Sequence, residues 1–119
     1  MKRTLSMMLA LALAVLLTTS AAAAQTRINF KRGSSSATLR GTIGVNRGVA
    51  GANYRNYVLR ANAGQTITAT VTSRNGKVVF AANDQTTYRI ETSSAQDYEL
   101  HIYNGGENST SYTLTVSIR

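Results

Sequence analysis

Apolar and polar residues alternate with a period of two along most of the chain after residue 24. The clearest case is residues 57–73, where two such runs flank the turn-forming residues 62–65. A strand points successive side chains to opposite faces, so this period predicts strands with one buried and one solvated face. Gly64 supplies the positive φ that a tight turn needs, and we expect the two runs to form a hairpin. The expected inward residues are Tyr57, Leu59, Ala61, Ile67, Ala69 and Val71.

The same pattern continues through the rest of the chain. Asn75-Gly76 is a strong hairpin signal, because both residues tolerate the positive φ of a type I′ turn. Residues 44–53 have no steady period and are predicted to be the longest loop; residues 104–108 are a second, flexible loop. Short strands at this spacing, without proline, favour an all-β fold, an antiparallel jelly-roll-like β-sandwich of about eight strands. The predicted strands are residues 27–31, 37–43, 57–61, 66–73, 78–82, 86–91, 98–103 and 112–118.

Threonine fills the outward positions of the run at residues 66–73. A regular array of hydroxyl groups is one interpretation of this pattern. Threonine is also the ordinary residue of exposed strand positions. Without repetition on neighbouring strands, we interpret these threonines as a solvated face with no special role.

Residues 1–24 have the three parts of a secretory signal peptide. A basic head precedes an apolar run at residues 7–17, and small residues end at Ala24. The run is well short of the ~20 apolar residues that a membrane-spanning helix requires. We predict cleavage after Ala24, a single domain of residues 25–119 without a membrane span, and a periplasmic or secreted location. The chain has no cysteine, which excludes disulfides and lipid attachment at the cleavage site.

The charge of the chain indicates an anionic partner. The formal net charge is +8, and removal of the two basic residues of the signal leaves +6. A basic exported protein is drawn to lipid head groups, wall polymers or an acidic protein cleft. We expect no nucleic-acid partner, because the arginines are scattered singly and export removes the protein from nucleic acid.

Few residues are suited to catalysis. Without cysteine there is no thiol nucleophile and no thiolate zinc site. His101 is the only histidine, and the alternation places it on a solvated face. We interpret Glu91, Asp97 and Glu99 as solvated charges rather than as the carboxylate pair of a glycosidase. We therefore predict a protein that is not an enzyme and needs no metal or cofactor.

Short motifs in residues 25–119 carry a resemblance to a known family. They are Ile28-Asn29-Phe30-Lys31-Arg32-Gly33-Ser34-Ser35-Ser36-Ala37, Gly41-Thr42-Ile43, Tyr57-x-Leu59-x-Ala61, Gly64-Gln65, Tyr98-Glu99-Leu100 and Tyr112-x-Leu114-x-Val116-x-Ile118. This set resembles the periplasmic inhibitors of goose-type lysozyme, and it is similar to the wider pre-peptidase C-terminal domains. Most matched positions are core or turn residues, so the resemblance implies the jelly-roll-like sandwich of these proteins more specifically than their activity.

The resemblance also implies a mode of binding, in which loops bearing arginine and tyrosine plug the lysozyme cleft. An inserted guanidinium makes charge-assisted hydrogen bonds to a catalytic carboxylate. The family's arginine-bearing loop corresponds to residues 104–108, which contain no arginine, and its Ser-Gly turn corresponds to Ala95-Gln96 beside Ser94. We therefore expect the loop at residues 44–53 and its flank to supply the contacts. The candidate binding residues are Arg47, Tyr54, Arg55, Ser94, His101 and Tyr103.

Two functions remain open at this point. The first is inhibition of a goose-type lysozyme, by a member or a diverged relative of that family. The second is a sandwich module that binds cell-wall polymer or another exported protein. Arginines converging on one rim would favour the first function. A shallow groove lined by His101, Tyr103 and other polar side chains would favour the second.

Overall fold

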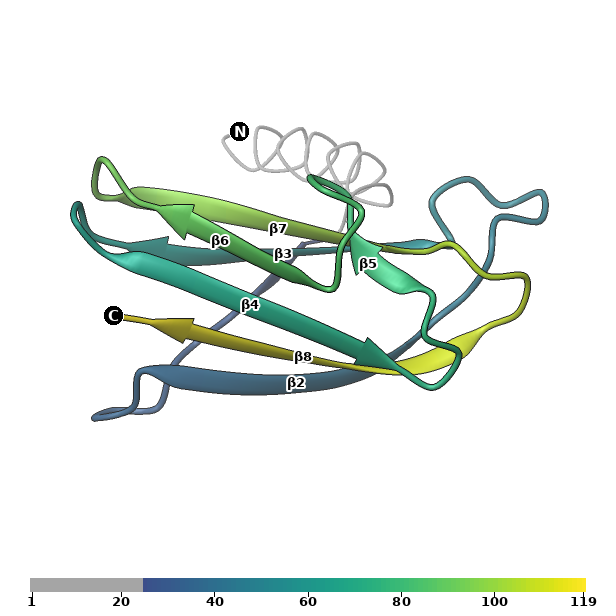
Figure 1. The fold of residues 1–119 in the computed structure, drawn as a ribbon, viewed down its shortest axis with the longest axis horizontal. Helices are drawn as coiled ribbons and strands as arrows, with labels where there is room; N and C mark the ends of the chain where they lie inside the picture. The colour runs from purple at the N-terminus through teal and green to yellow at the C-terminus, as the bar shows by residue number, and fades with distance from the viewer. Residues whose placement is uncertain (1–24) are drawn as a thin grey trace, which may run out of the picture.

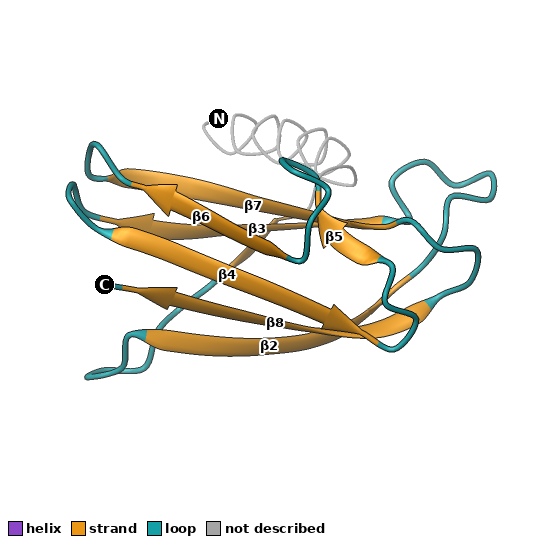
Figure 2. Ribbon diagram, viewed as in Figure 1, coloured by secondary structure: helices purple, strands orange, loops and turns teal. Residues whose placement is uncertain are grey.

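The computed structural model describes residues 25–119, which form strands and no helix (Figure 1 and Figure 2). The predicted signal peptide and its cleavage site fall on or next to residues 1–24, which lie outside the described residues. Within residues 25–119, no helix has the length and apolar character needed to cross a membrane. The strands are β1 (Gln25–Arg27), β2 (Ser36–Ile43), β3 (Tyr54–Ala61), β4 (Thr66–Ser73), β5 (Val78–Phe80), β6 (Thr87–Glu91), β7 (Gln96–Asn104) and β8 (Thr110–Ile118).

These strands form two four-stranded sheets that pack face to face. Sheet A has the order β1-β3-β7-β5, and sheet B has the order β2-β8-β4-β6. Neighbouring strands are antiparallel except for β1, which runs parallel to β3. The predicted all-β sandwich of about eight strands is confirmed, and the parallel β1–β3 pair is the exception to its antiparallel pairing.

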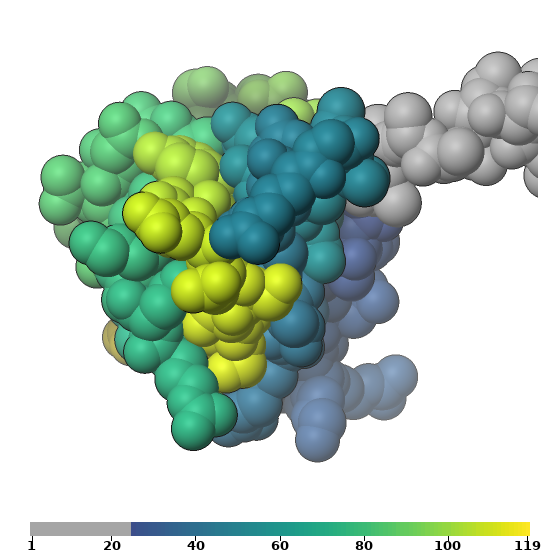
Figure 3. Space-filling model, turned by 90° about the vertical axis from the view of Figure 1, so that its right-hand side faces the viewer, coloured from purple at the N-terminus to yellow at the C-terminus, as the bar shows by residue number. Residues whose placement is uncertain are grey.

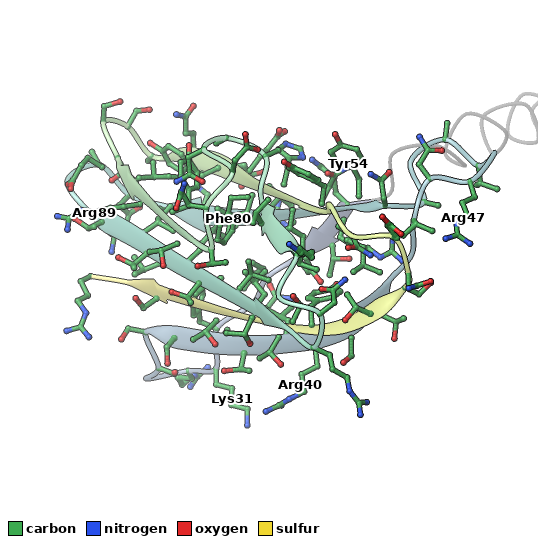
Figure 4. All side chains as sticks on the ribbon, turned by 45° about the vertical axis from the view of Figure 1, so that its right-hand side comes forward. Lys31, Arg40, Arg47, Tyr54, Phe80 and Arg89 are labelled. Atoms are coloured by element: carbon green, nitrogen blue, oxygen red, sulfur yellow. The ribbon has the colours of Figure 1, made fainter. Side chains whose placement is uncertain are left out.

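The inward residues of both sheets meet in one apolar core. Leu59 and Leu100 of sheet A and Ile67 and Leu114 of sheet B are all 0% exposed. Phe80 of β5, labelled in Figure 4, lies inside the sandwich and is equally buried. Alternate burial of this kind is how two half-apolar sheets remove their inner faces from water. The inward positions predicted from the alternation are confirmed.

The prediction that residues 57–73 form a hairpin is wrong. β3 lies in sheet A and β4 in sheet B, so the turn at residues 62–65 crosses between the sheets. Gly64 has the expected positive φ of 80°. The turn is held by Thr92, which follows β6: the Gln65 N–H donates to Thr92 Oγ1 at 2.7 Å, and the Gly64 N–H donates to the Thr92 carbonyl at 2.9 Å. Contacts distant in sequence therefore decide between a hairpin and a crossing.

The hairpin predicted at Asn75-Gly76 is wrong for a related reason. This turn joins β4 of sheet B to β5 of sheet A, and only Gly76, with φ of 69°, has the positive φ that a type I′ turn needs at both positions. The side chain of Asn75 instead closes a local turn, because its Oδ1 accepts from the Lys77 N–H at 2.8 Å and from Ser73 Oγ at 3.1 Å.

The first strand is shorter and earlier than the predicted residues 27–31. β1 ends at Arg27, and the chain then passes from sheet A to sheet B, where β2 begins at Ser36. Ile28 is nevertheless 3% exposed and Phe30 packs against the core, so the inward face was predicted correctly. The predicted loop at residues 44–53 is confirmed as the connection between β2 and β3.

Candidate functional site

Two loops meet at one end of the sandwich, which we call the loop end. They are the β2–β3 loop (residues 44–53) and the β7–β8 loop (residues 105–109). Figure 3 looks onto this end and shows the yellow β7–β8 loop between the blue β2–β3 loop and the green β4–β5 segment. The loops border a hollow of about 500 Å³. Its lining residues are Val45, Asn46, Arg47, Asn53, Tyr54, Tyr103, Asn104, Gly105, Gly106 and Glu107.

Asn104, the last residue of β7, joins the two loops. It is 3% exposed, and its Nδ2 donates to the carbonyl oxygens of Gly44 at 3.1 Å and of Asn108 at 2.9 Å. Its Oδ1 accepts from the Gly106 N–H at 2.9 Å, and its own N–H donates to the Asn53 carbonyl at 2.9 Å. A buried amide must satisfy its donors and acceptors, and here it does so by fixing both loops.

Arg47 reaches from the β2–β3 loop to the β7–β8 loop. Its Nη2 donates to the backbone carbonyl of Glu107 at 2.5 Å, and Figure 4 shows the side chain at the tip of its loop. The side chain is exposed, and Arg47 and Glu107 are the charged residues in the lining of the hollow. The sequence favours the β2–β3 loop over the β7–β8 loop as the binding element. The structure shows that they are neighbours in one surface.

Two tyrosines form the side of the hollow that belongs to sheet A. Tyr54 of β3 and Tyr103 of β7 are register neighbours whose ring centroids lie 5.7 Å apart. Tyr103 Oη donates to a carboxylate oxygen of Asp84 at 2.6 Å, and this hydrogen bond raises the pKa of Tyr103 above its ordinary value. Asp84 holds a positive φ of 58° in the β5–β6 connection. The Tyr103 ring is therefore positioned, whereas Tyr54 is 45% exposed and available for contact.

Arg55 is absent from the lining of the hollow. Its Nη1 donates to the carbonyl oxygens of Tyr54 at 2.7 Å and Ala52 at 3.3 Å, and its Nη2 donates to that of Thr42 at 2.9 Å. These bonds connect the start of β3 with β2 of the other sheet. The guanidinium is thus occupied in holding the base of the β2–β3 loop.

The structure places Ser94 and His101 away from the hollow. Ser94 lies in the β6–β7 turn, at the opposite end of the sandwich in Figure 1, where its carbonyl accepts from Tyr98 Oη at 2.8 Å. His101 lies on the outer face of sheet A, with Nδ1 at 2.5 Å from Asn56 Oδ1 and Nε2 at 2.9 Å from Glu99 Oε1. The hydrogen bond to His101 lowers the pKa of Glu99. Of the six candidate residues, the lining of the hollow contains Arg47, Tyr54 and Tyr103.

Two residues that shape the site were missed by the sequence analysis. Asn104 was assigned to a flexible loop, and Asp84 falls between the predicted strands at residues 78–82 and 86–91. The contacts that give them their roles join distant parts of the sequence: Asn104 bonds to Gly44 and Asn53, and Asp84 bonds to Tyr103. The residues around the hollow offer hydrogen-bonding and aromatic groups for contact with a partner. Within residues 25–119, no group of three or more His, Cys, Asp and Glu side chains is placed to hold a metal ion.

Comparisons with known proteins identify related folds. No family model matches the sequence, and no curated protein matches it. Among solved structures, a periplasmic inhibitor of g-type lysozyme from Aeromonas hydrophila, PliG, aligns with a TM-score of 0.58 and 22% identity over 80% of this chain and 96% of its own. A mutant of the Escherichia coli PliG aligns with a TM-score of 0.57 and 16% identity, over 80% of this chain and 97% of its own.

The Salmonella Typhimurium PliG, also a periplasmic inhibitor of g-type lysozyme, aligns with a TM-score of 0.55 and 19% identity, over 82% of this chain and 99% of its own. The resemblance that the motifs carry is therefore found again in the three-dimensional structure. At these identities the likeness establishes the fold. The chain has the fold of the periplasmic inhibitors of g-type lysozyme.

Proposed function

We propose that this chain is an exported, non-catalytic protein that inhibits a goose-type lysozyme by inserting its loop end into the active-site cleft. The observation that carries the proposal is the meeting of Arg47, Tyr54 and Tyr103 around one hollow, at the end of the sandwich where the loops extend beyond the strands (Figure 1). The solved structures that share the fold include three inhibitors of g-type lysozyme. Glycoside hydrolases place carboxylates beside the scissile bond, and a guanidinium is suited to bind them.

The exposed large hydrophobic residues also lie at the loop end, which supports its role as a protein-binding surface. Val49 is 63% exposed and Tyr54 is 45% exposed; these are the exposed large hydrophobic residues within residues 25–119. Val49 belongs to the β2–β3 loop and Tyr54 begins the strand that follows it. Arginine and tyrosine are over-represented among the residues that contribute most to protein–protein affinity.

The alternative of a polymer-binding groove lined by His101 and Tyr103 has less support. Tyr103 belongs to the hollow at the loop end. His101 is held between Asn56 and Glu99 on the outer face of sheet A and is absent from the lining of the hollow. We therefore assign the loop end to a lysozyme partner.

The test is a titration of a goose-type lysozyme with the purified exported protein, with cell-wall lysis as the readout. We expect saturable inhibition that weakens as salt rises, because contacts between exposed charges are screened beyond about 8–10 Å at physiological ionic strength. A lysozyme of another structural class serves as the control for specificity and should be little affected. Failure to slow the goose-type enzyme at low salt and high excess would contradict the proposal.

A further inference from the structure

The outer face of sheet B carries hydroxyl groups in rows that run across its strands. Thr38 of β2 pairs with Thr115 of β8, Thr115 pairs with Thr70 of β4, and Thr70 pairs with Thr87 of β6. One row therefore contains a threonine on each of the four strands. The repetition on neighbouring strands, which the sequence alone did not reveal, is present.

The next row brings arginines to the hydroxyl groups. Arg40 of β2 pairs with Thr113 of β8, and Thr113 pairs with Thr72 of β4. Arg74 follows β4, and its N–H donates to the Ser111 carbonyl at 3.1 Å. Arg40 and Arg74 therefore lie diagonally across β8, and both line a hollow of about 380 Å³ together with Thr72, Ser111 and Thr113.

The charge of this hollow is uncompensated by the residues around it. Its lining contains no aspartate or glutamate. Both arginines are exposed, and within residues 25–119 neither guanidinium makes an ion pair or a hydrogen bond. Figure 4 shows that Arg40 and Lys31 project away from the sandwich on the same side. An anionic group approaching this face therefore meets free cationic donors.

We propose that the outer face of sheet B binds an acidic polysaccharide, with a uronate carboxylate between Arg40 and Arg74 and sugar hydroxyls on the threonine rows. A guanidinium binds a carboxylate through two parallel hydrogen bonds. A threonine hydroxyl both donates and accepts, as a sugar hydroxyl does. Hydroxyls on a sheet repeat every ~4.7–4.9 Å across strands and every ~6.6–6.8 Å along them. A polymer of similar sugars presents hydroxyls and charges that also repeat.

Other anionic partners fit this face less well. The exposed large hydrophobic residues of residues 25–119, Val49 and Tyr54, both lie at the loop end, so this face offers nothing to insert into a lipid bilayer. An acidic protein surface does not repeat its hydrogen-bonding groups in two directions. The proposal is independent of lysozyme inhibition, because it uses other strands and other residues.

The test measures binding of the exported protein to oligogalacturonate by calorimetry, with neutral dextran and vesicles containing phosphatidylglycerol as comparison ligands. We expect binding to oligogalacturonate and none to dextran. The variant Arg40→Gln/Arg74→Gln should lose about tenfold or more in affinity. The control Arg60→Gln/Lys77→Gln removes the same charge outside sheet B and should change affinity by less than about threefold.

Equal losses of affinity in the two double variants would show that only the overall charge of the protein matters, and this would overturn the proposal. Binding to the vesicles without binding to oligogalacturonate would overturn it in favour of a membrane surface, and absence of binding to any ligand would overturn it outright. The wild-type protein gives a second measurement that needs no variant: oligogalacturonate should shift the amide NMR signals of Thr72 and Thr113. Shifts confined to the loop end would contradict the assignment of the site to sheet B.

Discussion

The hydroxyl groups of Tyr57 and Tyr112 form a hydrogen bond of 2.5 Å across the interior of the sandwich. Tyr57 lies on β3 of sheet A and Tyr112 on β8 of sheet B, and they are 6% and 5% exposed. Burial raises the pKa of Tyr57 well above its ordinary value, and the hydrogen bond to Tyr112 raises it further. This buried hydrogen bond therefore joins the two sheets inside the apolar core.

This pair predicts a loss of stability in alkaline solution. The unfolded chain releases the Tyr57 proton near pH 10, about its ordinary pKa, whereas the folded chain retains it. The free energy of unfolding must then decrease as pH rises above about 10. Denaturant unfolding of the wild type and of Tyr57→Phe across this range provides the check. The variant should lose about 1–3 kcal/mol at neutral pH, because the Tyr112 hydroxyl is left buried without its partner, and should show a shallower alkaline decline. Identical declines in the two proteins would contradict the assignment to Tyr57.

Gly41 makes room for the Tyr112 ring. A Cβ atom at this position would lie 2.8 Å from Tyr112 Oη and 3.0 Å from its Cζ. The Tyr112 ring cannot shift freely, because its hydroxyl group is hydrogen-bonded to that of Tyr57. We expect Gly41→Ala to destabilise the protein by about 1–3 kcal/mol through overpacking, measured by thermal or denaturant unfolding. Gly105→Ala is the control, since its nearest contact would be 3.5 Å away; a comparable loss there would show that the effect is not steric.

The attachment of β1 to sheet A is predicted to weaken at low pH. Arg27 donates to both carboxylate oxygens of Asp97, at 3.2 and 2.7 Å, and this bond lowers the pKa of Asp97. The resulting stabilisation is present above the unfolded pKa of about 3.9 and is lost as pH falls through the folded value. Hydrogen exchange of the Ile28 amide, which donates to the Val58 carbonyl at 2.8 Å, reports on this strand. Its protection factor should fall in acid in the wild type.

The variant Asp97→Asn is the control for this acid dependence. It lacks the carboxylate, so the protection of Ile28 should already be reduced at neutral pH and change little in acid. An unchanged protection factor in the variant at neutral pH would show that the ion pair does not hold β1.

The sequence was sufficient to predict which residues face inward, because burial follows the period of two within each strand. Leu59 and Leu114 are buried for this local reason. The pairing of the strands was not predictable in the same way. The turn at residues 62–65 suits a hairpin as well as a crossing, and the contacts of Thr92 with Gly64 and Gln65 decide the matter from 27 residues further along the chain.

Asn104 is predicted to matter for both stability and inhibition. Asn104→Ala removes the donor of the partly buried hydrogen bonds to the carbonyl oxygens of Gly44 and Asn108, which should lower the free energy of unfolding by about 1–3 kcal/mol. It also frees the two loops from each other, so the concentration needed for half-inhibition of the lysozyme should rise. Unfolding and inhibition assays check the two effects. Asn46→Ala is the control: it lines the same hollow without a side-chain hydrogen bond to residues 25–119, and its effect on stability should lie within about 0.5 kcal/mol.

The candidate site was predictable only in part, because contacts between residues distant in the sequence bring it together. Arg47, Tyr54 and Tyr103 were recognised by residue type, because arginine and tyrosine suit a protein interface. Tyr54 and Tyr103 meet through the register of β3 and β7. The loop that carries Arg47 is held beside them by Asn104, which binds the carbonyl of Gly44 from 60 residues away. The threonine rows of sheet B escaped the sequence analysis because they exist only after β2, β8, β4 and β6 are placed in order.

Arg47 is predicted to be the most important charged residue for inhibition. Arg47→Ala removes the guanidinium of the hollow and should raise the concentration needed for half-inhibition by about tenfold or more. Glu107→Ala is a matched control, because Arg47 binds the backbone carbonyl of Glu107, which alanine retains. This variant should inhibit as well as the wild type or better, since it removes a negative charge that faces an acidic cleft. The salt dependence of inhibition should be weaker in Arg47→Ala than in Glu107→Ala. Equal inhibition by the two variants would place the contact surface elsewhere on the sandwich.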